Sequence, residues 1–117
     1  MAKKFFGTGD IILVDAGPVP EGVHEQSGKR PWLVLSDPVL CANTGFVWAV
    51  PFTTTDRDYP LTLKWRSEEQ GTKTHGTLLV HQLATVDVRN RDSKFLEHTD
   101  NIPPEVYDYI SAILAKK

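Results

Sequence analysis

The chain has 117 residues, of which 40% are hydrophobic and 24% charged, with a formal net charge of −2. This size and composition suit one soluble globular domain, residues 1–117, whose core needs neither disulfides nor a structural metal. No apolar run reaches the roughly 18 residues of a membrane span. Cys41 is the single cysteine, so we exclude an intrachain disulfide and expect a cytoplasmic location.

The pattern of apolar residues in the first half of the chain predicts three strands. A continuous apolar run at 11–14 is typical of a strand covered on both faces. The glycine- and proline-rich segment 16–30 predicts a long loop. A second buried strand follows at 32–35, then a turn or a single helical turn within 38–45 and a third strand at 46–52. Pro51 near the end of that strand indicates a bulge or an edge.

The second half predicts shorter strands and one helix. Residues 61–66 alternate between apolar and polar, as in a half-buried strand, and 67–75 form a polar loop. Further short strands are expected at 77–80 and 85–88. After Pro103 and Pro104 the apolar residues take helical spacing. The pattern therefore predicts a mainly β fold with a C-terminal α-helix, arranged as a small, partly closed barrel.

The loop before the second strand gathers groups suited to phosphate chemistry. It contains His24, Glu25, Gln26 and Lys29 and ends at Arg30. RNA can be cut without a metal when a base activates the 2′-OH, an acid protonates the leaving oxygen and donors stabilise the charged phosphorus. Arginine suits the last task because its planar fork matches two phosphate oxygens. For an isolated Arg-Pro pair, however, a solvated surface arginine would be the better interpretation.

A wider set of motifs follows in a fixed order along nearly the whole chain. They are Gly9-Asp10-Ile11, His24-Glu25-Gln26, Arg30-Pro31-Trp32-Leu33-Val34-Leu35-Ser36, Val50-Pro51-Phe52-Thr53-Thr54, Gly76-Thr77-Leu78 and Gln82-Leu83-Ala84-Thr85-Val86-Asp87. In this order and spacing the chain resembles the MazF/PemK (Kid) family of toxin ribonucleases. The Glu-Gln-x-x-x-Arg-Pro element, followed by a strand that ends in Pro-Phe-Thr, is the most specific part of the resemblance.

The resemblance implies a fold, an activity and partners. The fold is an SH3-like (CcdB/PemK-type) barrel that forms a homodimer. The activity is metal-independent cleavage of single-stranded RNA, without a cofactor, to leave a 2′,3′-cyclic phosphate. The protein partner is an antitoxin like MazE or PemI, whose disordered tail blocks the RNA groove.

The same resemblance implies catalytic residues. Arg30 matches the arginine and Thr53 the threonine that face the scissile phosphate in the family, and His24 matches a histidine of the PemK branch. That branch also carries an arginine and an aspartate, where this chain has Leu79 and His81. His81 replaces the aspartate as a proton carrier, or it is a strand-end histidine bonded to a backbone carbonyl.

Several other polar residues are candidates for RNA binding. Glu25 and Gln26 either contact RNA or support the loop. The lysines and arginines of the set could line a groove that binds the phosphate backbone of RNA. The full set is Glu25, Gln26, Lys29, Arg57, Lys64, Arg66 and Lys73. The alternative is an ordinary solvated face, diluted by Glu68 and Glu69. The net charge of −2 also argues against a dedicated nucleic-acid binder.

A non-enzymatic function and a metal site both fit the sequence less well. A non-enzymatic toxin or binding module of the same barrel, such as the CcdB gyrase poisons, uses a C-terminal tryptophan, whereas this chain ends in Ala115-Lys116-Lys117. A metal site is not expected, because the four histidines and Cys41 lack zinc-type spacing. We therefore expect an endoribonuclease that uses no metal.

Overall fold

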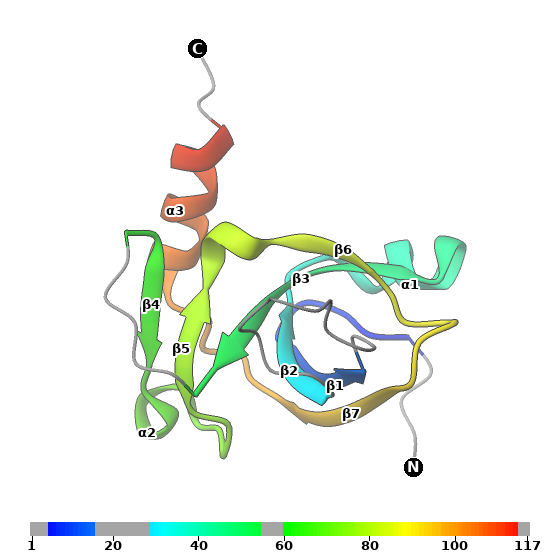
Figure 1. Cartoon of the computed structure of the whole chain (residues 1–117), viewed down its shortest axis with the longest axis horizontal. Helices are drawn as coiled ribbons and strands as arrows, with labels where there is room; N and C mark the ends of the chain where they lie inside the picture. Colours follow the sequence, from blue (N-terminus) through cyan, green and yellow to red (C-terminus); the bar gives the residue numbers. More distant parts are fainter. Residues whose placement is uncertain (1–4, 16–28, 55–59, 115–117) are drawn as a thin grey trace, which may run out of the picture.

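The structure, a computed structural model, describes residues 5–15, 29–54 and 60–114. Figure 1 shows the strands and helices of this part of the chain. In chain order they are β1 (Asp10–Asp15), β2 (Lys29–Val34), α1 (Pro38–Thr44), β3 (Phe46–Thr53), β4 (Thr62–Trp65), α2 (Ser67–Gln70), β5 (Gly76–Leu79), the 3₁₀ helix η1 (Val80–Gln82), β6 (Ala84–Asp87), β7 (Ser93–His98) and α3 (Pro104–Leu114).

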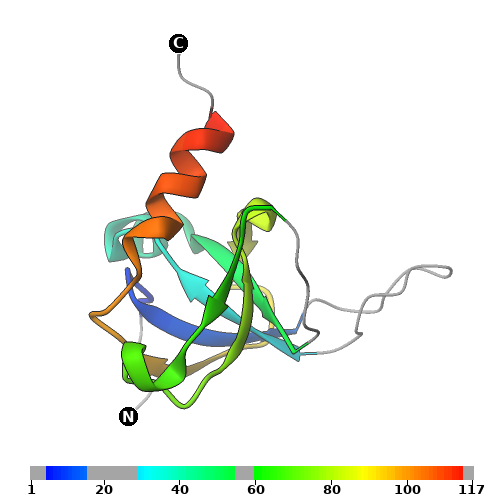
Figure 2. The same cartoon turned by 90° about the vertical axis from the view of Figure 1, so that its left-hand side faces the viewer.

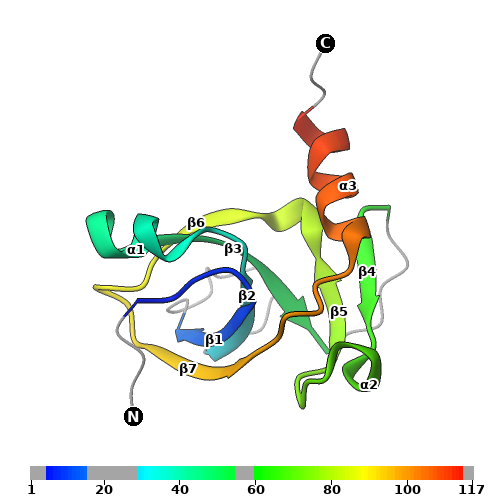
Figure 3. The same ribbon diagram turned by 180° about the vertical axis from the view of Figure 1, so that it is seen from behind.

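The strands form one antiparallel sheet in the order β4-β5-β3-β2-β1-β7, and β6 pairs with β3 off this path. The sheet curls around β1, β2 and β7, whereas β4 and β5 extend to one side (Figures 1 and 3). Its edge strands β4 and β7 do not pair with each other in the described ladders, so the barrel stays open. The predicted mainly β fold with a C-terminal helix is confirmed.

The two faces of the sheet bury separate hydrophobic clusters. The inner cluster lies within the curl and consists of Phe6, Ile12, Val14, Val34, Cys41, Val47, Ala49 and Val86, with Trp32, Val88 and Phe95 packed against it. The outer cluster joins the sheet to α3 through Ile11, Leu33, Val50, Phe52, Trp65, Leu78, Val80 and Val106. Figure 2 shows α3 leaving this contact and projecting beyond the sheet. Strand residues therefore alternate between the two clusters.

Strand β3 changes its partner along one edge. Phe46 to Ala49 pair with β6, and Phe52 and Thr53 pair with β5. Between these ladders, two residues of β3 lie opposite five residues of the segment that joins the β5 ladder to the β6 ladder. The 3₁₀ helix η1 accommodates the additional residues of this segment.

Pro51 lies at this interruption. The N–H of Trp48 points to the β2 side, where Ser36 Oγ accepts it at 3.0 Å. By alternation along the strand, position 51 faces the opposite edge, which is the edge that η1 interrupts. The missing N–H of proline therefore breaks no regular ladder there, and the predicted irregularity at Pro51 is present.

Helix α1 is longer than the single turn expected from the sequence. Asp37 caps its start by accepting the N–H of Val39 at 2.9 Å, and Pro38 occupies the first turn. Gly45 ends it with a left-handed φ of 78°. The short helix α2, within the segment 67–75 expected to be a loop, and strand β7 were both missed by the sequence pattern. In β7 half-buried and exposed residues alternate, but two of the three half-buried positions hold Ser93 and Glu97, so no apolar alternation marks this strand.

Candidate active site

Arg30 and Thr53 lie on neighbouring strands. Arg30 is the second residue of β2, and Thr53 is the last residue of β3. The ladder between these strands is regular as far as the pair Trp32–Pro51. Continued by two residues on each strand, the same register places Arg30 opposite Thr53. Alternation also puts both side chains on the face of the sheet that carries Trp32.

A polar row continues from Thr53 across the sheet. Thr53 pairs with Thr77 of β5, and Thr77 pairs with Lys64 of β4. Directly opposed residues share a face, with Cβ atoms roughly 5 Å apart. Thr53 and Thr77 are 8% and 4% exposed, whereas Lys64 is exposed. The hydroxyls of Thr53 and Thr77 therefore lie between the position of Arg30 and the ammonium group of Lys64.

Gly76 brings β5 close to Thr53. Its φ is +128°, a conformation that side chains rarely adopt. A Cβ at this position would lie 2.5 Å from the carbonyl oxygen of Thr53. Glycine is thus required for the close approach of the two strands beside the candidate catalytic threonine. Gly76 and Thr77 were recognised in the sequence as part of a motif, but only strand register reveals that they are neighbours of Thr53.

His81 lies on η1, and its side chain is exposed. The 3₁₀ helix contacts α3, β3 and β4. The role of His81 in proton transfer stays a prediction.

The remaining predicted cations fall into different settings. Lys29 Nζ lies 2.9 Å from Asp92 Oδ2, and this hydrogen bond raises the pKa of the lysine. Arg66 is exposed directly after β4. Lys73 is exposed in the connection to β5, where its backbone N–H donates to Glu97.

Glu97 fastens that connection to β7. Its carboxylate also accepts the N–H of Thr74 at 2.8 Å and the hydroxyl of Thr74 at 2.6 Å. Burial raises the pKa of Glu97, but these hydrogen bonds outweigh that effect and leave the pKa lowered. The anchored connection therefore holds the start of β5, and with it Gly76 and Thr77, in a defined position.

Four predicted site residues, His24, Glu25, Gln26 and Arg57, lie outside the described residues. Within the described ranges, no three histidine, cysteine or acidic side chains gather as a metal site would require. The helices described there include none with the length and apolar character to cross a membrane.

Comparison with known proteins gives one family and a consistent set of relatives. Residues 8–116 match the family described as PemK-like, MazF-like toxin of type II toxin–antitoxin system. The endoribonuclease toxin MazF of Escherichia coli K12 is 34% identical over 83 residues, which are 71% of this chain and 69% of that protein.

Solved structures share the fold. MazF of Deinococcus radiodurans superimposes with a TM-score of 0.76 at 24% identity, covering 97% of this chain and all of that one. A MazE–MazF complex from the same organism gives 0.73 at 24% identity, covering 98% and 100%. A mycobacterial endoribonuclease in complex with its cognate antitoxin gives 0.59 at 21% identity, covering 93% and 90%.

Proposed function

The chain belongs to the family of PemK-like, MazF-like toxins of type II toxin–antitoxin systems, and we propose that it is a metal-independent endoribonuclease. Its substrate is single-stranded RNA. The 2′-OH of one nucleotide attacks the adjacent phosphorus, the bond to the 5′-oxygen of the next nucleotide breaks, and a 2′,3′-cyclic phosphate remains. The curated relative from Escherichia coli is named an endoribonuclease.

The observation that carries this proposal is the placement of Arg30 and Thr53 at the same end of neighbouring strands and on one face. There a guanidinium binds two non-bridging phosphate oxygens through parallel N–H donors. The threonine hydroxyl donates a further hydrogen bond to the charge that develops on phosphorus. Such donors accelerate the reaction because they point at the transition state before the reaction begins.

Proton transfer is assigned to histidine. His24 takes the proton from the 2′-OH or returns one to the leaving oxygen, and His81 is the second candidate. Lys64 and Arg66 of the β4 region, with Lys29, Arg57 and Lys73, hold the phosphate backbone, and Glu25 and Gln26 contact RNA or support the loop. Because these contacts are electrostatic, RNA affinity falls as salt concentration rises.

A chimeric oligonucleotide assay in EDTA tests the function. The wild-type protein is expected to cleave an all-ribose strand in EDTA and to leave a 2′,3′-cyclic phosphate, detected by mass spectrometry. A strand with 2′-deoxyribose at the cleavage site is expected to stay intact, because the nucleophile is absent. Cleavage of that strand, or dependence on added magnesium, would refute the mechanism.

We also propose that the protein forms a homodimer in the cytoplasm and is held inactive by an antitoxin. Several neighbouring structures are complexes of MazE with MazF. On β3, Phe46 and Trp48 are 38% and 54% exposed and alternate with buried Val47 and Ala49. Exposed aromatic side chains on a strand are typical of a protein interface. Light scattering at micromolar concentration is expected to give twice the chain mass, and Trp48→Lys to shift it towards the monomer.

A further inference from the structure

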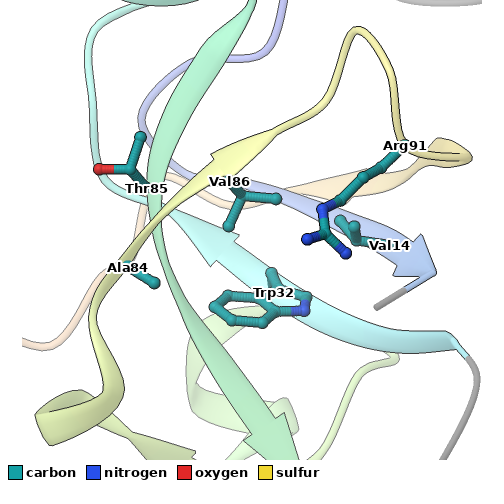
Figure 4. Close-up of a pocket in the computed structure, with 6 residues that line it drawn as sticks. All are labelled: Val14, Trp32, Ala84, Thr85, Val86 and Arg91. Atoms are coloured by element: carbon teal, nitrogen blue, oxygen red, sulfur yellow. The ribbon is translucent and has the colours of Figure 1, made fainter. Parts of the chain in front are cut away.

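On the β2 side, the candidate site adjoins a small pocket. Trp32, which lies two residues after Arg30 on β2, and Val14, which pairs with Arg30, both contribute to it. The cavity has a volume of about 200 Å³ and is lined by Val14, Trp32, Ala84, Thr85, Val86 and Arg91 (Figure 4). Among the described residues that line it there is no histidine or acidic residue, the usual proton carriers in catalysis. Its nitrogen-bearing side chains, Trp32 and Arg91, only donate hydrogen bonds.

On the other side of Thr53, strand β5 offers two positions on the face of the polar row. Thr77 pairs with Thr53 and with Lys64, and Leu79 pairs with Thr62. Leu79 therefore lies on the same face as Thr77. It is apolar and only 4% exposed, so it supplies neither a charge nor a proton. A proton carrier on this side has to come from a residue next to the strand.

His75 directly precedes β5 and lies two residues before Thr77. A Cβ built on Gly76 would lie 2.5 Å from the carbonyl oxygen of Thr53. One Cα–Cβ bond and one step of about 3.8 Å between consecutive Cα atoms then place the Cα of His75 within about 8 Å of that oxygen. The imidazole nitrogens extend roughly 3–5 Å beyond Cα at ordinary bond lengths. The ring can therefore reach a phosphate that the Thr53 hydroxyl binds.

The backbone on both sides of His75 is held in place, whereas the His75 side chain is exposed. Before it, Thr74 donates its N–H and its hydroxyl to Glu97 at 2.8 and 2.6 Å. After it, Gly76 pairs with Trp65 of β4 and lies against Thr53. The imidazole is thus accessible to a substrate and starts from a fixed position, which lowers the entropy lost when it meets the phosphate.

His81 is the other described histidine close to β5 in the sequence. It lies four residues after Thr77, beyond the end of β5 and on the 3₁₀ helix η1. His75 lies only two residues from Thr77 and next to the glycine that approaches Thr53. Along the chain, His75 is therefore the closer of the two histidines to the residue that pairs with Thr53.

We propose that His75 is a further catalytic residue, which donates a proton to the leaving 5′-oxygen. The proposal rests on the ribonuclease function proposed above. As the 2′-oxygen forms its bond to phosphorus, the bond from phosphorus to the 5′-oxygen breaks and its electron pair stays on that oxygen. The 5′-oxygen takes the proton of the His75 imidazolium and leaves as a hydroxyl group.

This assignment leaves removal of the 2′-OH proton to His24. His24 belongs to the segment that enters β2, and β2 flanks β3 on the side opposite to β5. The attacking and leaving oxygens lie roughly in line, on opposite sides of phosphorus. An acid from the β5 side and a base from the β2 side of β3 suit that geometry.

A substrate with a better leaving group tests the role of His75. Single-turnover cleavage is compared for ordinary RNA and for RNA with sulfur in place of the 5′-oxygen at the cleaved bond. A thiolate leaves without a proton, so the sulfur-containing RNA needs no general acid. His75→Gln is expected to cleave ordinary RNA at least about 100-fold more slowly than the wild type, because a general acid contributes about 10²- to 10⁴-fold. The same variant is expected to cleave the sulfur-containing RNA at nearly the wild-type rate.

Two controls separate proton transfer from folding and from RNA binding. His98→Gln is the matched variant, because Asp10 and Asp100 bind both ring nitrogens of His98. It is expected to cleave both substrates at the wild-type rate. A strand that carries 2′-deoxyribose and is not cut is expected to bind His75→Gln and the wild-type protein with similar affinity.

The possible failures of the proposal are distinguishable. A rate loss of equal size for both substrates in His75→Gln would overturn the assignment, since the loss would not concern the leaving group. Unchanged cleavage of ordinary RNA by this variant would overturn it as well. Failure of the wild-type protein to cleave ordinary RNA would instead reject the ribonuclease function on which the proposal rests.

Discussion

The N-terminal half of β3 pairs with β6, buries Val47 and Ala49 and exposes Trp48, whereas the C-terminal half pairs with β5 and ends in Thr53 beside Thr77. Both halves follow one alternation of side chains, and they differ in the strand that accompanies them. The insertion of η1 lets β5 and β6 approach β3 in different registers. A change of partner strand, not of side-chain pattern, thus separates the packing half from the half that carries candidate chemistry.

The largest effect is expected for Arg30→Ala, which removes the cation beside the C-terminal half of β3. Loss of a preorganised donor to the transition state costs about 10²- to 10³-fold in rate. Single-turnover cleavage measures the effect, and circular dichroism checks that the fold is intact. Lys94→Ala, an exposed cation on β7, is the control and is expected to cleave normally. Near wild-type cleavage by Arg30→Ala would remove this residue from the mechanism.

Thr53→Val is expected to lower the cleavage rate about 10- to 100-fold, because valine keeps the β-branched shape and loses the hydroxyl. Thr53→Ser keeps the hydroxyl and is expected to retain most of the rate. The comparison of the two variants separates hydrogen bonding from strand packing. Equal rates for valine and serine would show that Thr53 is only a strand residue.

Gly76→Ala is expected to destabilise the fold by about 2–3 kcal/mol, since it combines an unfavourable φ with a clash at the Thr53 carbonyl. Gly71→Ala is the matched control. Gly71 also has a positive φ, of 68°, but its nearest neighbouring atom, Asn101 Nδ2, is 4.0 Å from the added Cβ. Its cost is expected to be about 1 kcal/mol. Urea unfolding measures both, and equal costs would show that close approach at Thr53 is unimportant.

The smallest effect concerns pH and is expected where β1 meets β7. His98 Nε2 is 2.8 Å from Asp100, and Nδ1 is 2.8 Å from buried Asp10. The hydrogen bonds to Asp100 and Asp10 raise the pKa of His98 above 6.5. A raised pKa in the folded state adds stability below pH 6.5, and this is lost as pH rises through the folded-state pKa.

Urea unfolding midpoints between pH 5.5 and 8.5 test this expectation. The wild-type midpoint should fall over the range, and His98→Gln should flatten the dependence. The effect is expected to be small, because the His98 side chain is 41% exposed and solvent screens its charge. If His98→Gln kept the full pH dependence of the urea midpoint, other titratable groups would be responsible for it.

Most of the fold was predictable from the sequence because its signals are local. Apolar runs marked β1, β2 and β3, and helical spacing after Pro104 marked α3. Strand β7 gave no such signal, since Glu97 takes a half-buried position where it accepts hydrogen bonds from Lys73 and Thr74. The hydrogen-bond donors that stabilise the Glu97 carboxylate at this position come from a segment distant in the sequence.

The candidate site shows the same division. Arg30 and Thr53 were predicted from motifs, but Thr77 and Gly76 gained their candidate roles only from register and packing. The structure buries Trp65 against Phe52, with ring centroids 5.3 Å apart at 89°.

By itself the sequence determined most of the strands, the C-terminal helix, the family and the guanidinium and hydroxyl groups available for chemistry, because periodicity and motifs are properties of neighbouring residues. Only the tertiary structure decided which of these groups share a face, that β3 changes partner at η1, and that the indole N–H of Trp32 is buried without a hydrogen-bond partner in the described chain. Those features depend on strand register, which contacts between distant segments set and no single segment encodes.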